Sequence, residues 1–265
     1  MQRLASTVLT AFALLGASAG ALRAQSETMM YDHVHLAVAN PPAAAAWYSQ
    51  HFGGEPVDGR DERTLIGVTR FIFREEANAR PSEGGAVDHL GFSVPDLDAK
   101  LRELQATGAT ISAPRRDAEG LFPLAFVVDP WGVKLEIIQD PHHLGFHHIH
   151  LRSTDPEATL QSYLKLFGGV RTPLRGRLDG ILYPGNVWVL VTRGEGFPTA
   201  GSAIDHLGWR ALQILPKLEQ FRGEGVNVQR GPNDLTFVNG TITVFFIDGP
   251  NGATIEIVQR APTMR

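Results

Sequence analysis

The 265-residue chain contains no cysteine. Disulfide bonds, a cysteine-ligated zinc site, a lipid attached to an N-terminal cysteine and a thiol nucleophile are therefore excluded. Any metal ion must be held by histidine and carboxylate side chains. The chain also has little excess charge, because 24 basic and 28 acidic residues give a net charge of −4. That balance argues against nucleic acid as a partner.

Charged residues are missing from one long stretch, residues 4–22, which follows Arg3 and is rich in Ala, Leu, Thr and Gly. This pattern is typical of a signal peptide. We expect residues 1–24 to be removed at the Ala24–Gln25 junction and the mature protein to be periplasmic or secreted. An uncleaved membrane anchor is the alternative, because the stretch is nearly long enough to span a bilayer. No other segment approaches that length, so no membrane association is expected after cleavage.

The two halves of the sequence repeat one another. Residues 81–92 read PSEGGAVDHLGF and residues 198–209 read PTAGSAIDHLGW, at an offset of 117 residues (206 − 89). Each half divides again, since YDHVHLAV at 31–38 resembles VDHLGFSV at 87–94, and FHHIHLRS at 146–153 resembles IDHLGWRA at 204–211. The repeats predict four copies of one structural module.

Each module begins with a strand-like segment, continues with a helical segment and ends with about three β-rich runs. Asp96 is expected to cap one helix and either Thr154 or Asp155 to cap another, which Gly168 is expected to end. The order of elements predicts an α+β protein of four βαβββ modules. We expect them to pair within each half, giving one domain over residues 31–140 and a second over 146–260, joined by a short linker.

Alternation along the opening strands sorts their side chains onto two faces. Val34, Leu36 and Val38 would face the helices, which leaves His33 and His35 on the opposite face. The other openings show the same parity and place further histidines on that face: His89, His148, His150 and His206. In the closing strands, Glu136 and Glu256 stand between apolar residues. Two histidines and one carboxylate suit Zn²⁺, Fe²⁺ or Mn²⁺ and leave positions open for a substrate.

This combination of motifs resembles the vicinal-oxygen-chelate superfamily, which includes glyoxalase I, fosfomycin- and bleomycin-resistance proteins and extradiol dioxygenases. The resemblance rests on the Asp-His openings, on Phe-Gly-Gly after the first helix of each half, and on DPWGVKLE at 129–136. It implies paired modules whose U-shaped mixed sheets surround a divalent metal. Carried over by position, the metal ligands would be His33, His89 and Glu136 in the first domain and His148, His206 and Glu256 in the second.

His35 and His150 each lie two residues after a proposed ligand and on the same face. A general acid/base or substrate-orienting role would suit a side chain that titrates near neutral pH. Alternation alone leaves another assignment open, in which His35 and His150 are the ligands and His33 and His148 their neighbours.

Two subtypes of the superfamily lack their characteristic residue here. The fourth glutamate ligand of glyoxalase I would fall at Ile72 in the first half and near Val189 or Leu190 in the second. The tyrosine of the extradiol dioxygenases would fall at Phe126 and Phe245. A three-ligand site similar to that of the fosfomycin-resistance enzymes is what the resemblance implies.

We expect His142, His143 and His147 to be solvated, since they lie in or beside the linker. Arg115 and Arg116 are interpreted as a solvated loop pair, with a substrate carboxylate as the alternative partner.

The function predicted from the sequence is that of a metal-dependent lyase, isomerase or dioxygenase that acts on a small organic molecule. The alternative is a protein of the bleomycin-resistance type that sequesters a small molecule or drug without catalysis. The protein is expected to be a monomer or a homodimer.

Overall fold

The computed structural model describes residues 28–264 of the chain. The expected signal peptide, residues 1–24, lies outside these residues. Among the helices of the described part, none is long and apolar enough to cross a membrane.

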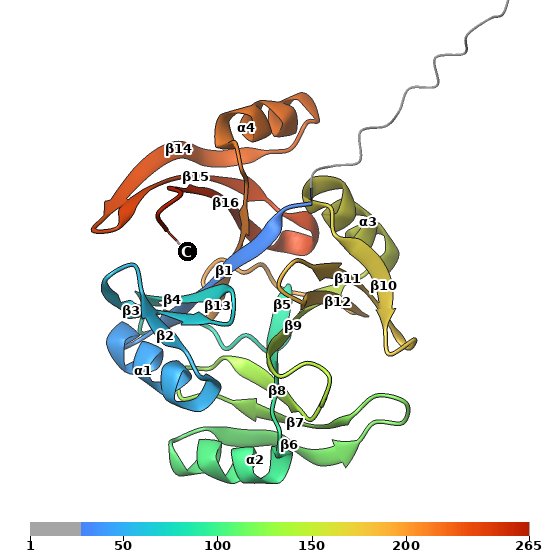
Figure 1. The fold of residues 1–265 in the computed structure, drawn as a ribbon. Helices are drawn as coiled ribbons and strands as arrows, with labels where there is room; N and C mark the ends of the chain where they lie inside the picture. Colours follow the sequence, from blue (N-terminus) through green and yellow to red (C-terminus); the bar gives the residue numbers. More distant parts are fainter. Residues whose placement is uncertain (1–27, 265) are drawn as a thin grey trace, which may run out of the picture.

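The structure contains four modules, each with one strand, one helix and three further strands, as the sequence predicts (Figure 1). The first comprises β1 (Met30–Val38), α1 (Pro41–Phe52), β2 (Glu55–Val57), β3 (Arg60–Ile66) and β4 (Thr69–Glu75). The second comprises β5 (Val87–Ser93), α2 (Leu97–Ala106), β6 (Thr110–Asp117), β7 (Pro123–Val128) and β8 (Lys134–Ile138). The third comprises β9 (Gly145–Ser153), α3 (Pro156–Phe167), β10 (Val170–Leu174), β11 (Leu178–Tyr183) and β12 (Val187–Arg193). The fourth comprises β13 (Ile204–Arg210), α4 (Ile214–Gly223), β14 (Val228–Phe237), β15 (Gly240–Asp248), the 3-10 helix η1 (Pro250–Gly252) and β16 (Thr254–Arg260).

Side chains just before three of the helices accept hydrogen bonds from their first turns. The carboxylates of Asp96 and Asp155 accept from the third residue beyond them, as predicted, and Asn40 does the same for α1. These contacts satisfy amide groups that lack a partner inside the helix. Helix α3 ends at Gly168, whose φ of 70° lies in the region that favours glycine.

The modules pair into two eight-stranded mixed sheets, which confirms the α+β fold class, but the pairs are not the consecutive ones. Sheet A has the order β14-β15-β16-β13-β1-β4-β3-β2 and joins the first and fourth modules. Sheet D has the order β10-β11-β12-β9-β5-β8-β7-β6 and joins the second and third. Each sheet therefore crosses the linker that we took as a domain boundary, because the opening strand of each module pairs with one from the other half.

The helices make the opposite connections and link consecutive modules. Phe52 of α1 stacks on Phe92 of the second module with ring centroids 3.8 Å apart, and Phe167 of α3 stacks on Trp209 of the fourth at 4.3 Å. One core cluster contains buried residues from both sheets and all four helices. Helix packing within each half and strand pairing between the halves thus interlock the two halves of the chain.

Candidate metal centres

The opening strands occupy the middle of both sheets, and this places their histidines opposite one another. In sheet A, β1 pairs with β13 and His35 lies across from His206. In sheet D, β5 pairs with β9 and His89 lies across from His150. Each closing strand lies parallel to the opening strand of its own module, so Glu256 stands beside Gly208 and Glu136 beside Gly91.

In each opening strand the pairing register shifts by one residue next to a histidine, so that one residue of the strand has no partner opposite it. The extra residue is Asp32 in β1, Asp88 in β5, His147 in β9 and Asp205 in β13. Each lies directly before a histidine and contacts the Nδ1 atom of that histidine with its side chain. These shifts follow the pattern of a β-bulge, in which two residues on one strand face a single partner.

The centre in sheet A gathers His33, His35, His206 and Glu256. Glu256 Oε2 lies 3.0 Å from His206 Nε2, 3.4 Å from His33 Nε2 and 4.0 Å from His35 Nε2. The ring of His35 stacks on that of His206 with centroids 4.0 Å apart.

The centre in sheet D gathers His89, His148, His150 and Glu136. Glu136 Oε2 lies 3.0 Å from both His89 Nε2 and His148 Nε2. His150 Nε2 lies 2.5 Å from Thr192 Oγ1, and His150 Nδ1 is buried without a hydrogen-bond partner among the described residues.

All six predicted ligands lie in these two centres, but the predicted grouping is wrong. The structure brings His33 to His206 and Glu256, and His148 to His89 and Glu136. His33 and His148 have exchanged places relative to the prediction, because β1 and β9 pair across the halves.

The donor atoms fit a divalent metal. Ligand atoms bound at 2.0–2.1 Å lie about 3.0–3.4 Å apart when the angle at the metal is between square and tetrahedral. The distances from Glu136 and Glu256 to the ligand histidines fall in this range. His33 Nε2 points to this spot while buried and without a hydrogen-bond partner in the described chain.

Two glycines make the space for these rings. A Cβ atom on Gly91 would lie 2.1 Å from the ring of His148, and one on Gly208 would lie 2.1 Å from the ring of His33. The ring of His148 therefore lies directly above Gly91 and the ring of His33 above Gly208, and each ring extends toward the glutamate of its centre.

Carboxylates orient three of the four ligand histidines, a role that our sequence reasoning did not assign. The Nδ1 atoms of His33, His89 and His206 lie 2.8, 2.6 and 2.5 Å from the carboxylates of the preceding residues. Such a contact keeps the proton on Nδ1 and leaves the Nε2 lone pair for a metal. The Asp-His dipeptide, present in three of the four openings, was the signal for it.

The glutamates are ionised at neutral pH despite their burial. Burial alone would raise the pKa of Glu136, but the hydrogen bonds from His148 and His89 outweigh it and hold the pKa well below its usual range. For Glu256, the charge of His33 and the hydrogen bond from His206 likewise overcome burial and keep its pKa well below normal. Both carboxylates can serve as anionic ligands.

His35 and His150 are held neutral. Burial is the main cause that lowers the pKa of each well below its usual value, and repulsion from the neighbouring histidines adds to it. Glu256 Oε2 lies closer to His33 Nε2 than to His35 Nε2, which favours His33 as the metal ligand.

A cavity of about 350 Å³ adjoins the centre in sheet D. Its wall is mostly apolar, and Arg116, Lys134 and Arg152 also line it. Four of the apolar side chains, Phe122, Leu124, Leu174 and Leu190, belong to a buried cluster that also contains Ile138 and Trp188.

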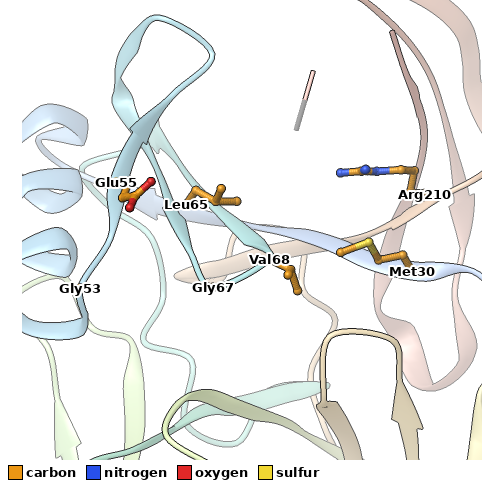
Figure 2. A pocket seen from close by; sticks show the side chains of 7 residues that line it. All are labelled: Met30, Gly53, Glu55, Leu65, Gly67, Val68 and Arg210. Carbon is orange, nitrogen blue, oxygen red and sulfur yellow. The ribbon is translucent and has the colours of Figure 1, made fainter. Parts of the chain in front are cut away.

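The centre in sheet A adjoins a pocket of about 470 Å³ that is lined by His35, Arg63 and Ile72 among others. A buried network of charges adjoins His33, in which Asp32 pairs with Arg260 and Arg210. A cavity of about 510 Å³ lies beyond it and has none of the four centre residues in its lining. Met30 and Arg210 lie on one side of this cavity, and Leu65 and Val68 of the β3–β4 hairpin lie on the other (Figure 2).

Three of the positions expected to distinguish the enzyme subtypes lie opposite residues of the two centres. Ile72 stands opposite His35 and Leu190 opposite His150, so these two residues are structural equivalents. Phe126 pairs with Glu136, whereas the residue that pairs with Glu256 is Phe246 rather than Phe245. Phe245 points into the core instead, because the equivalence between the two halves shifts by one residue here.

His147 is not solvated as we expected. It is fully buried, because β9 already begins at Gly145 and carries His147 into the sheet. His142 is exposed and His143 half-buried, which leaves the prediction intact for His142. Arg115 and Arg116 lie in strand β6 and not in a loop as predicted. Arg115 lies near Asp98 and Asp117, while Arg116 lines the sheet D cavity.

Comparisons with known proteins agree with this architecture. Residues 31–137 match the sequence model of the Glyoxalase/Bleomycin resistance protein/Dioxygenase superfamily. A segment of 99 residues is 32% identical to 4-hydroxyphenylpyruvate dioxygenase of Caenorhabditis elegans; it covers 31% of this chain and 25% of that protein. The chain thus spans about a quarter of the length of the curated relatives that it matches.

Solved structures extend the likeness to the whole fold. Glyoxalase I of Zea mays superposes with a TM-score of 0.64 at 14% identity, over 88% of this chain and 92% of that one. A mutant form of the same protein gives 0.65 at 17% identity over the same fractions. Residues 31–137 therefore match the Glyoxalase/Bleomycin resistance protein/Dioxygenase superfamily, and the described chain as a whole has the two-sheet fold of glyoxalase I.

Proposed function

We propose that the protein is a divalent-metal-dependent enzyme that acts on a small organic molecule through two neighbouring oxygen atoms. The observation that carries this proposal is the convergence of His89, His148 and Glu136 beside a cavity of about 350 Å³. A bound Fe²⁺, Mn²⁺ or Zn²⁺ would supply a Lewis acid there. Three protein ligands leave coordination positions for the substrate oxygens.

The cavity beside this centre suits a molecule with an apolar body. Phe122, Leu124 and Leu190 offer apolar contacts, and the volume matches a small ligand. Arg116 reaches the cavity without an ion-pair partner among the described residues, so an acidic group on the substrate would find a counter-charge.

His150 is the residue that we assign to proton transfer or substrate orientation in sheet D, with His35 as its equivalent in sheet A. Burial keeps each of these histidines neutral by lowering its pKa. Each also lies within the ligand cluster and can accept a proton. Thr192 holds His150 Nε2, which fixes the direction of its ring.

The reaction type is proposed at the level of lyase, isomerase or dioxygenase chemistry. Leu190 and Ile72 supply no fourth carboxylate of the glyoxalase kind, and Phe126 supplies no phenol of the extradiol kind. A three-ligand centre with an open coordination sphere is compatible with each of these reactions.

Metal content tests the proposal. Protein purified without chelators should contain close to two divalent ions per chain by elemental analysis. His89→Ala should remove one ion from sheet D and His206→Ala one from sheet A, while the exposed His142→Ala should keep both. Wild-type protein without any stoichiometric ion would contradict the proposal and favour a sequestering protein that binds its ligand in the same cavity.

We also propose that the chain is exported, on the basis of the uncharged stretch 4–22 alone. The mass of protein recovered from the periplasm or medium should correspond to a chain that begins near Gln25. Full-length protein found only in the membrane fraction would instead support the anchor.

A further inference from the structure

The two centres differ in what holds one of their histidines. In sheet A both ligand histidines contact carboxylates, Asp32 and Asp205. In sheet D, His89 contacts Asp88, but His148 Nδ1 lies 3.0 Å from the Nδ1 atom of His147. His147 and Asp32 occupy equivalent bulge positions in β9 and β1.

A contact between two Nδ1 atoms can hold only one proton. When His148 offers its Nε2 lone pair to a metal, its proton must lie on Nδ1 and be donated to His147. The proton of a neutral His147 then lies on Nε2, which is 3.6 Å from Asp140 Oδ2. Arg175 in turn pairs with Asp140. In sheet D the carboxylate of Asp140 is therefore separated from His148 by the ring of His147, whereas in sheet A Asp32 contacts His33 directly.

His147 is well placed to fix this arrangement. It is fully buried, and its ring lies between His148 and the side chains of Phe122 and His143. Packing against Phe122 and His143 therefore holds the ring of His147 beside His148.

We propose that His147 is a positioning residue that gives His148 a neutral hydrogen-bond acceptor in place of a carboxylate. An imidazole that donates to a neutral group is a weaker electron donor than one that donates to a carboxylate. The metal in sheet D is consequently bound less tightly than it would be with an aspartate at this position, and it keeps more of its positive charge for a substrate. This inference rests on the proposed metal function, and the centre concerned is the one beside the apolar cavity.

Three substitutions at one position separate the effects of charge, hydrogen bonding and packing. His147→Asn keeps a neutral acceptor near the position of Nδ1, His147→Asp has the shape of the Asn variant with a negative charge, and His147→Leu removes the acceptor. The full-length apo protein would be titrated with Zn²⁺ against a chromophoric chelator. The sheet D centre is identified as the one lost in His89→Ala, and thermal unfolding reports whether each variant is folded.

We expect His147→Asn to keep the wild-type affinity in sheet D, His147→Asp to tighten it about tenfold and His147→Leu to weaken it about tenfold, with sheet A unchanged. Equal Zn²⁺ affinities for the Asn, Asp and Leu variants would overturn the inference and leave the metal function standing. Parallel loss in the Asn and Leu variants would also overturn it, since His147 would then matter only for packing. Wild-type protein that binds no Zn²⁺ at either centre would overturn both proposals.

Discussion

At the scale of the residue, the absence of a side chain matters as much as the ligands. Positions 91 and 208 require glycine, because a Cβ atom on Gly91 or Gly208 would overlap the ring of His148 or His33. Their φ angles are ordinary, so it is the close approach of the ring and not backbone freedom that requires glycine. Each centre thus depends both on the residues that would bind the metal and on a glycine that leaves room for a histidine ring.

Gly91→Ala should displace His148 and remove the metal from sheet D, whereas Gly208→Ala should displace His33 and affect sheet A alone. Elemental analysis of each purified variant measures the loss, which we expect to be close to one ion per chain. Gly223→Ala is the control, since nothing lies within 4 Å of a Cβ there. Full metal content in Gly91→Ala would show that His148 is not a ligand.

Much of the site could be predicted from these residues. Alternation along β1, β5, β9 and β13 places the histidines on one face wherever the strands pair, so their face is a local property. The grouping is not local, because it depends on which strands become neighbours. The second and fourth modules begin almost alike, as VDHLGF and IDHLGW, and either could pair with β1 as far as the pattern shows. The burial of His147 also escaped prediction, since a sequence next to a linker does not reveal how early the strand begins.

At the scale of the element, one helix and one turn connect consecutive modules. Tyr48 of α1 donates a hydrogen bond of 2.8 Å to Asp129, which lies in the turn before β8. The other carboxylate oxygen accepts from the backbone amides of Trp131 and Val133. In the second half, Tyr163 of α3 and Asn251 make the corresponding contact at 3.5 Å, with a neutral side chain in place of the carboxylate.

Asp129 should make the stability of the protein depend on pH. Burial raises the pKa of Asp129 to about 6 from an ordinary value of 3.8. The folded protein therefore binds this proton more tightly than the unfolded chain does. The contribution of Asp129 to the free energy of unfolding should fall as the pH rises from about 4 to about 6, by at most about 3 kcal/mol.

Asp129→Asn tests this, because its amide carries no charge, while its oxygen can accept from the backbone amides of Trp131 and Val133 and its Nδ2 can donate to the Tyr48 hydroxyl oxygen. Urea unfolding at pH 4 and at pH 7 should show a smaller difference in the variant than in the wild type. An unchanged difference between the two pH values would mean that Asp129 is ionised throughout this range.

At the scale of the whole molecule, the halves are interlocked rather than lined up in tandem. The helices join the first module to the second and the third to the fourth, whereas the sheets join the first to the fourth and the second to the third. Each metal centre therefore takes residues from both halves. Neither half contains a complete set of two histidines and a glutamate at one centre.

A cut between His143 and Leu144 should leave the two halves associated. Protein with an inserted protease site there should keep its native size in size-exclusion chromatography after cleavage, and should also keep both metal ions. The reason is that β1–β13 and β5–β9 pairing holds the pieces together. Uncut protein carrying the same insertion is the control. Separation into two half-sized species without denaturant would contradict the interlocked arrangement.

The pairing of the first strand with the last module also bears on the order of folding. In sheet D the facing residues His89 and His150 are 61 positions apart (150 − 89), whereas in sheet A His35 and His206 are 171 apart (206 − 35). The added loop length costs only about 1 kcal/mol of chain entropy, so the effect is on timing more than on stability. A chain that emerges from its N-terminal end can pair β5 with β9 before β13 is available, and until then one edge of β1 stays open for pairing with other chains. We therefore expect the centre in sheet D to be complete first and the fourth module to complete the centre in sheet A.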